Sequence, residues 1–340
     1  MNRLLEWNES FAAVKPTHQT VVVIGAIDTG KTSWLLHFAR ILNDTHICFV
    51  NGDLGQGIIG APGLLASAHL NQLPPHETVS VQRCVFIGHN QPVGHFMSVL
   101  TGLHHLVEDA RTKAQWVLVD TDGLVSGTPG FEYKRNLIHL LQPATVVIFV
   151  TPETEALVEY CAYLDKVQLY RVTPPAEIQP KSPANRWETR HRRYESWFTN
   201  ARLYEFSLDT IRLIGDGFGW GQPLSPDETR AMGDALEVPI LYGEVLKDTI
   251  TLLVARPPLT LIYARIRERW GFRHIHIVPA VRWLRRLMGD IHPDGFSRGM
   301  GYFQGWDTDT RRIRILGRFL EDPGRIWRVG SITYPERVSD

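Results

Sequence analysis

A chain of 340 residues has room for one large domain or two to three smaller ones, and its 44% hydrophobic and 21% charged residues are typical of a globular protein. Three widely spaced cysteines exclude a disulfide scaffold or a cysteine metal knuckle, and no apolar run approaches the 18 residues of a membrane span. The N-terminus has no signal-peptide core, so we expect a cytoplasmic protein.

The formal net charge is zero, but residues 1–170 carry 10 basic and 15 acidic residues (net −5) and residues 171–340 carry 26 and 21 (net +5). This asymmetry fits either a second half that meets an anionic partner or ordinary variation in surface charge.

Four apolar runs rich in β-branched residues predict the strands of the first half, at residues 21–26, 47–53, 116–122 and 145–151. They do not alternate with polar residues, which is typical of parallel strands covered on both faces. Helical spacing follows the first run ("KTSWLLHFARIL") and precedes the third ("GHFMSVLTGLHHLVEDA") and the fourth ("YKRNLIHLL"). The order of strands and helices predicts an α/β domain with a doubly wound, mostly parallel sheet.

The residue composition and the hydrophobic pattern change in the second half of the chain. Residues 172–186 are rich in proline and predict a loop, and a basic, helix-like stretch follows. From residue 206 on, short strands separated by turn signals predict a smaller, strand-rich C-terminal domain, with helices over "LTLIYARIRERWG" and "AVRWLRRLMGDI". We therefore predict an N-terminal extension (1–17), a phosphate-loop domain (18–205) with a lid at about 180–202, and a C-terminal domain (206–340). The arginines and aromatics of the C-terminal domain fit either nucleic-acid contact or a β-domain core with solvated arginines.

The stretch "GAIDTGKT" after the first predicted strand matches the phosphate-loop pattern G-x-x-x-x-G-K-[ST]. Its glycines let successive backbone N–H groups point at the phosphates, and the following helix adds its positive N-terminal end. In this pattern the lysine contacts the β- and γ-phosphates and the threonine hydroxyl ligates Mg²⁺. The sequence thus predicts binding of Mg²⁺ and ATP, or another nucleoside triphosphate. The predicted nucleotide-binding residues are Gly25, Ile27, Asp28, Thr29, Gly30, Lys31, Thr32 and Ser33.

Two aspartates come at the ends of predicted strands beside this loop. Asp53 lies in "VNGDLGQG" and Asp120 in "LVDTDGLVSG". A phosphoryl-transfer site needs one carboxylate near Mg²⁺ and can use a second to accept the proton of the attacking hydroxyl. We therefore predict a metal site formed by Thr32, Asp53 and Asp120.

Arginines gather on the predicted basic helix. Arg186, Arg190 and Arg193 fall at i, i+4 and i+7, so a helix places them on one face. A solvated basic helix is the simplest interpretation, but the planar guanidinium also matches phosphate oxygens. A proline-rich approach followed by an arginine face is typical of a lid that closes over a triphosphate.

Five segments in this order resemble those of the polynucleotide 5′-hydroxyl kinases related to the RNA kinase subunit of the pre-mRNA cleavage machinery and to ribosomal-RNA-processing kinases. They are "GAIDTGKTS", "NGDLGQGIIGAPG", "VFIGHNQPVGHF", "VDTDGLVSG" and "RWETR", and the resemblance covers roughly residues 18–202. It implies an ATP-dependent transfer of phosphate to the 5′-hydroxyl end of RNA or DNA, and it leaves protein partners open.

The resemblance also implies roles for single residues. Asp53 would be the catalytic carboxylate, Lys31 a catalytic cation, and Arg186, Arg190 and Arg193 lid arginines. A clasp for the 5′ end of the polynucleotide would include Thr121, Gly123 and Leu124, with Gln56 and His89 in the same groove. The chain departs from the family in two places, because Leu124 stands where a tryptophan is usual and Gln91 where a serine is frequent.

Two other functions fit the phosphate loop. A non-catalytic assembly factor would keep ATP bound as a structural element of a processing complex, although it would not need Asp53 or Arg190. A small-molecule enzyme of a related phosphate-loop class would turn over ATP regardless of oligonucleotides, and its substrate binding would lack a steep salt dependence.

Overall fold

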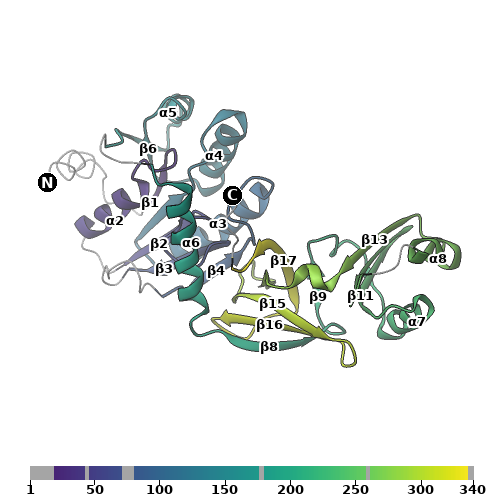
Figure 1. Cartoon of the computed structure of the whole chain (residues 1–340). Coiled ribbons are helices and arrows are strands. Elements are labelled where there is room, and N and C mark those ends of the chain that lie inside the picture. The colour runs from purple at the N-terminus through teal and green to yellow at the C-terminus, as the bar shows by residue number, and fades with distance from the viewer. Residues whose placement is uncertain (1–18, 43–45, 71–79, 176–179, 258–260, 336–340) are drawn as a thin grey trace. The chain divides into compact units, whose positions relative to one another are not determined.

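The computed structural model describes residues 19–42, 46–70, 80–175, 180–257 and 261–335 (Figure 1). The predicted N-terminal extension, 1–17, lies outside the described residues. The chain divides into two compact units, one ending at Tyr194 and the other beginning at Glu195. This division falls inside a helix, whereas the boundary proposed from sequence follows residue 205.

The first unit contains a seven-stranded sheet in the order β4-β3-β2-β5-β1-β6-β7. Its four predicted strands are confirmed as β2, β5, β1 and β6, which pair in parallel at the centre of the sheet. The pairs β2–β3 and β3–β4 are antiparallel and extend one edge. The strands span β1 (Gln19–Ile24), β2 (Ile47–Gly52), β3 (Leu64–His69), β4 (Arg83–Phe86), β5 (Trp116–Thr121), β6 (Thr145–Phe149) and β7 (Gln168–Val172).

Helices connect these strands in two directions across the sheet. They are α2 (Lys31–Leu42), α3 (Phe96–Arg111), α4 (Gly127–Leu141) and α5 (Glu155–Ala162), and a further helix, α6 (Pro183–Phe198), follows β7. The connection through α2 runs from β1 toward β2, whereas those through α3, α4 and α5 run the other way across the sheet. With right-handed crossovers, α2 covers one face and the other three helices cover the opposite face. In agreement, α4 packs against both α3 and α5. The carboxyl ends of β1 and β5 therefore lie at the topological switch point, where doubly wound sheets bind ligands.

The second unit is strand-rich, as predicted. It contains a six-stranded sheet (β8-β16-β15-β14-β17-β9) and a four-stranded sheet (β10-β11-β12-β13). The core of this unit includes the fully buried rings of Trp283, Phe303 and Trp327. The strands span β8 (Arg202–Ser207), β9 (Arg212–Ile214), β10 (Gln222–Pro223), β11 (Ile240–Leu246), β12 (Thr249–Val254), β13 (His274–Pro279), β14 (Arg286–Ile291), β15 (Gly299–Asp307), β16 (Arg312–Phe319) and β17 (Ile326–Thr333).

The helices predicted for the second unit are confirmed only in part. The helix predicted over "LTLIYARIRERWG" is confirmed as α8 (Leu261–Trp270), whereas α7 (Pro226–Leu236) was not predicted. The helix predicted over "AVRWLRRLMGDI" is wrong, because a short 3₁₀ turn (Ala280–Trp283) leads into strand β14. Arg285 interrupts the stretch with a left-handed φ of 66°, and β14 pairs on both sides, with β15 and β17. In the part of the chain that the structure describes, no helix has the length and apolar character needed to cross a membrane.

Candidate active site

The phosphate loop connects the carboxyl end of β1 to the first turn of α2. Gly25 is required by close packing, since a Cβ there would lie 2.8 Å from Phe149 Cβ and 2.8 Å from Thr29 Oγ1. The loop turns through two left-handed residues, Asp28 (φ 58°) and Gly30 (φ 98°), and the Thr29 hydroxyl donates to the Ala26 carbonyl at 2.9 Å. This curled backbone at a helix N-terminus is suited to holding phosphate groups.

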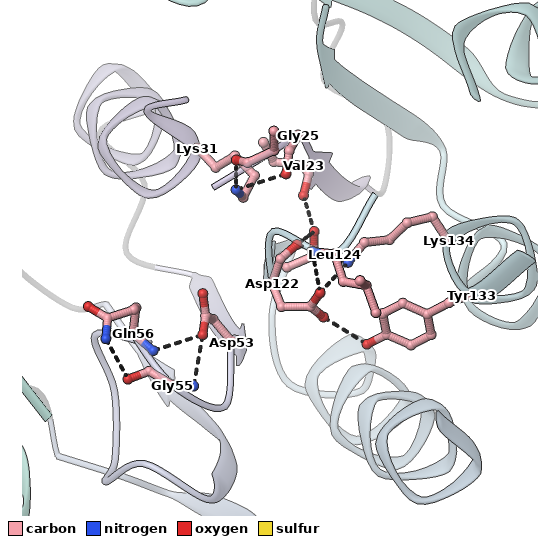
Figure 2. A network of polar contacts seen from close by, with 12 residues as sticks. Val23, Gly25, Lys31, Asp53, Gly55, Gln56, Asp122, Leu124, Tyr133 and Lys134 are labelled. Atoms are coloured by element: carbon pink, nitrogen blue, oxygen red, sulfur yellow. Dashed lines mark hydrogen bonds and ion pairs between the residues drawn. The ribbon is translucent and has the colours of Figure 1, made fainter. Parts of the chain in front are cut away.

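The Lys31 ammonium lies buried beneath the loop. Its Nζ donates to the carbonyl oxygens of Gly25 and Ala26, at 3.0 and 2.7 Å (Figure 2). A phosphate oxygen in the loop is a stronger acceptor for the same ammonium, because a hydrogen bond between two ions is stronger than one to a neutral carbonyl.

Thr32 and Asp120 form a polar pair between α2 and β5. The Thr32 hydroxyl donates to Asp120 Oδ2 at 2.6 Å. Burial raises the pKa of Asp120 to about 6, against the opposing effects of the Thr32 hydrogen bond and the Lys31 charge. Asp120 Oδ1 is buried and accepts no hydrogen bond from the described residues. A buried carboxylate oxygen without a partner, beside a hydroxyl oxygen, fits the oxygen-rich surroundings that Mg²⁺ prefers.

Asp53 is held in a fixed orientation just after β2. Its Oδ1 accepts the backbone N–H groups of Gly55 and Gln56, both at 2.8 Å (Figure 2). The buried Asn51 side chain supports the same turn by donating to the Asp53 carbonyl at 3.1 Å and accepting the Ile58 N–H at 3.1 Å. These bonds leave Oδ2 of Asp53 available on a side chain that lines the cavity described below.

The predicted lid lies at the start of α6 and is tied to the phosphate loop. Arg186 donates to Asp28 Oδ2 at 2.7 Å, and the Lys181 N–H donates to the same oxygen at 2.9 Å. The Gln56 amide donates to the Arg186 carbonyl at 3.3 Å. Arg193 is partly buried, which lowers the pKa of its guanidinium, while the charge of Asp53 opposes that shift.

A short loop after β5, residues 122–126, contains Gly123 and Leu124, two of the three residues predicted to form the clasp. Gly123 allows it to approach the phosphate loop, because a Cβ there would lie 2.4 Å from Ile27 Cγ1. Asp122 Oδ1 accepts the Leu124 N–H at 2.9 Å, and its Oδ2 accepts the Tyr133 hydroxyl at 2.8 Å (Figure 2). The Lys134 ammonium lies 3.1 Å from Asp122 Oδ1.

A cavity of about 580 Å³ brings most of the predicted residues together. Its walls include Ile27, Asp28, Thr29, Gly30, Lys31, Thr32, Ser33, Asp53, Gln56, Gly123, Leu124, Arg186 and Arg190. Five predicted residues are not on its walls: Gly25, His89, Asp120, Thr121 and Arg193. Thr121 is buried and donates to the Val23 carbonyl at 2.8 Å, so its side chain supports the sheet. His89 instead packs against His95, with ring centroids 3.8 Å apart.

Several residues at the cavity were not predicted as site residues, although they lie in segments that the sequence singled out. Asn90, Gln91, Pro92 and Val93, from the recognised segment before α3, contribute a wall, and Lys181 lies in the predicted lid. Asp122 stood inside a recognised segment, and its position after a strand was the available signal. Lys134 gave no signal, because its contact with Asp122 depends on how α4 packs.

Comparison with known proteins agrees with this geometry. The family model described as "mRNA cleavage and polyadenylation factor CLP1 P-loop" matches residues 25–200. The polyribonucleotide 5′-hydroxyl-kinase of Methanocaldococcus jannaschii is 22% identical over 325 residues, covering 92% of this chain and 86% of the relative. That of Thermococcus kodakarensis is 26% identical over 309 residues, covering 87% and 82%.

Solved structures show the same fold. The wild-type Clp1p–Pcf11p complex matches with a TM-score of 0.62 at 10% identity, covering 99% of this chain and 79% of that one. A second Clp1p–Pcf11p structure, with the same TM-score, is described as giving the structural basis for ATP loss in a point mutant. Because the family model spans more than half of the 340 residues, this chain belongs to the CLP1 P-loop family.

Proposed function

We propose that this protein is an ATP-dependent polynucleotide 5′-hydroxyl kinase that acts on RNA ends. The observation that carries the proposal is the position of Asp53, whose carboxylate is fixed by two backbone N–H groups in the same cavity as the phosphate loop, the lid and the clasp. The relatives named polyribonucleotide 5′-hydroxyl-kinase, similar over most of the chain, support the same activity.

In the proposed reaction, the oxygen of the terminal 5′-hydroxyl forms a bond to the γ-phosphorus while the bond from that phosphorus to the β,γ-bridging oxygen breaks. ADP leaves, and the hydroxyl proton passes to the Asp53 carboxylate. Lys31, Arg186 and Arg190 supply positive charge around the transferring group. Such positioning and charge stabilisation account for most of the catalysis in phosphoryl transfer.

Mg²⁺ would be held by Thr32 and Asp120, with Asp53 near enough that its charge raises the pKa of Asp120. When bound, the ion neutralises charge on the β- and γ-phosphates. The unpartnered Oδ1 of Asp120 supports this assignment.

The clasp and the loop of residues 90–93 form the cavity walls that remain for the acceptor. Leu124 presents an aliphatic side chain to this space where the family usually has tryptophan. Stacking of a base on an aromatic side chain is worth about 1–3 kcal/mol, so we expect this protein to hold the terminal base more weakly than a tryptophan-bearing relative does.

The test is a transfer assay with γ-labelled ATP and four acceptors: RNA with a 5′-hydroxyl, the same RNA with a 5′-phosphate, the matching DNA, and no acceptor. We expect label on the 5′-hydroxyl RNA only in the presence of Mg²⁺, none on the 5′-phosphate RNA, and none with Lys31→Ala. Tight ATP binding without transfer to RNA or DNA would instead favour the non-catalytic assembly factor. ATP turnover unaffected by oligonucleotides would favour a small-molecule enzyme.

A further inference from the structure

A fully buried lysine lies behind the clasp. The Lys134 side chain is 0% exposed and its partner Asp122 is 8% exposed, with 3.1 Å between Nζ and Oδ1. The same ammonium donates to the Asp122 backbone carbonyl at 3.0 Å. Figure 2 shows Lys134 and Tyr133, both from α4, on either side of the Asp122 carboxylate.

Asp122 in turn fixes the conformation of the clasp. It accepts the Leu124 N–H, and Gly123 between them lies in contact with Ile27 of the phosphate loop. Any shift of the Asp122 carboxylate therefore moves the segment that closes the acceptor side of the cavity.

Tyr133 connects this network to the opposite wall. Its hydroxyl donates to Asp122, while its ring stacks on Phe96 with centroids 5.0 Å apart and an interplanar angle of 30°. Phe96 is the first residue of α3 and follows the loop whose residues 90–93 line the cavity. Tyr133 and Lys134, which are adjacent in α4, thus contact Asp122 at the clasp, and Tyr133 also contacts Phe96, which follows the loop of residues 90–93.

A buried ion pair such as Asp122–Lys134 is expected to add little net free energy of unfolding. Removing two charges from water costs several kcal/mol each, and replacing a buried ion pair by apolar residues is often neutral or stabilising. A buried network that holds the clasp through Asp122 and contacts Phe96 through Tyr133 is better explained by the geometry it imposes on the site.

We propose that Tyr133 and Lys134 are positioning residues that, through Asp122 and Phe96, set the distance between the two acceptor walls and so align the RNA 5′ end with the phosphate loop. This inference rests on the proposed function. It assigns the acceptor alignment to α4, and it assigns nucleotide binding to the phosphate loop and the lid.

The experiment compares kcat/KM for 5′-hydroxyl RNA with the dissociation constant for ATP. Tyr133→Phe removes one hydroxyl and keeps the ring stack. The double variant Asp122→Asn/Lys134→Met removes both charges together, so that no buried ion is left unpaired. Controls are Tyr160→Phe, which removes a hydroxyl paired with His139, and Lys113→Met, which breaks a half-exposed ion pair with Asp109.

We expect kcat/KM for RNA to fall about 3- to 10-fold in Tyr133→Phe, the equivalent of one net hydrogen bond, and at least 10-fold in the double variant. ATP affinity should stay within twofold, and both controls should match the wild type. The proposal is overturned if the network variants keep their RNA kinetics, or if ATP affinity falls as much as RNA usage. If the wild-type protein binds ATP but labels no RNA, the proposed kinase function itself is refuted. That outcome is distinct from the two outcomes that refute only the positioning role.

Discussion

The ion pair between Asp28 and Arg186 makes the phosphate loop itself the docking site of the lid. Asp28 adopts φ 58°, a conformation that costs a residue other than glycine about 1 kcal/mol or more. Its Oδ2 accepts from Arg186 at 2.7 Å and from the Lys181 N–H at 2.9 Å. We predict that Asp28→Ala releases the lid in the nucleotide-free protein.

The exposed fractions of the two side chains determine how much the loss of this ion pair should destabilise the lid. The side chains of Arg186 and Asp28 are 29% and 15% exposed, so the pair lies between a surface ion pair, worth about 0.2–1 kcal/mol, and a well-shielded charged hydrogen bond, worth about 1.5–3 kcal/mol. We expect about 1–2 kcal/mol, which corresponds to a roughly 5- to 30-fold faster amide hydrogen exchange in residues 183–190.

The assay is hydrogen exchange of ATP-free protein, with Glu188→Ala as the control. Glu188 pairs with Arg192 at 2.6 Å on the same helix, but these side chains are 54% and 70% exposed. The control should change exchange by less than about twofold. Arg186→Ala should reproduce the effect of Asp28→Ala, and the double variant should add little to either. If Asp28→Ala raises lid exchange no more than Glu188→Ala does, the pair does not hold the lid.

Three further predictions concern the clasp and Asp120, the carboxylate proposed to bind Mg²⁺. Leu124→Trp should lower the Michaelis constant for single-stranded RNA about 5-fold or more by adding a stacking surface, and an unchanged constant would mean that the terminal base does not reach this wall. Gly123→Ala should lower both ATP affinity and transfer, because the added Cβ would lie 2.4 Å from Ile27 Cγ1; wild-type values for both would show that the two loops separate easily. Because burial raises the pKa of Asp120 from its ordinary value of 3.8 to about 6, the metal-free folded state binds more protons than the unfolded state between these values. The free energy of unfolding should therefore fall by about 3 kcal/mol as pH rises through this window, and parallel curves for wild type and Asp120→Asn in chemical denaturation would refute that.

The central sheet and the phosphate loop could be predicted because their signals are local. The runs that became β1, β2, β5 and β6 each contain at least four consecutive apolar residues, and the loop pattern spans eight residues. Strand β3 ("LLASAH") was missed because small and polar residues dilute its apolar character, although five of its six residues are buried. Helix α7 was missed despite a complete capping box between Ser225 and Glu228.

The parts of the site that could not be predicted depend on contacts between distant residues. Arg186 and Asp28 are 158 positions apart, and no local pattern specifies their pairing. Lys134 stands in an amphipathic helix, where a lysine usually faces solvent, and only the packing of α4 against the clasp buries it. Thr121 matched the clasp segment in sequence, but the strand places its hydroxyl on the Val23 carbonyl.

The most direct test of the proposed chemistry is single-turnover transfer from γ-labelled ATP to a 5′-hydroxyl RNA by wild-type protein and Asp53→Asn, side by side. Asparagine can still accept the Gly55 and Gln56 N–H groups through its Oδ1, but it cannot take up the hydroxyl proton. We predict that the wild type labels the RNA, and that Asp53→Asn binds ATP normally but transfers at least about 100-fold more slowly. Equal transfer by both proteins would contradict the role of Asp53, and ATP binding without labelled RNA in the wild type would contradict the kinase itself.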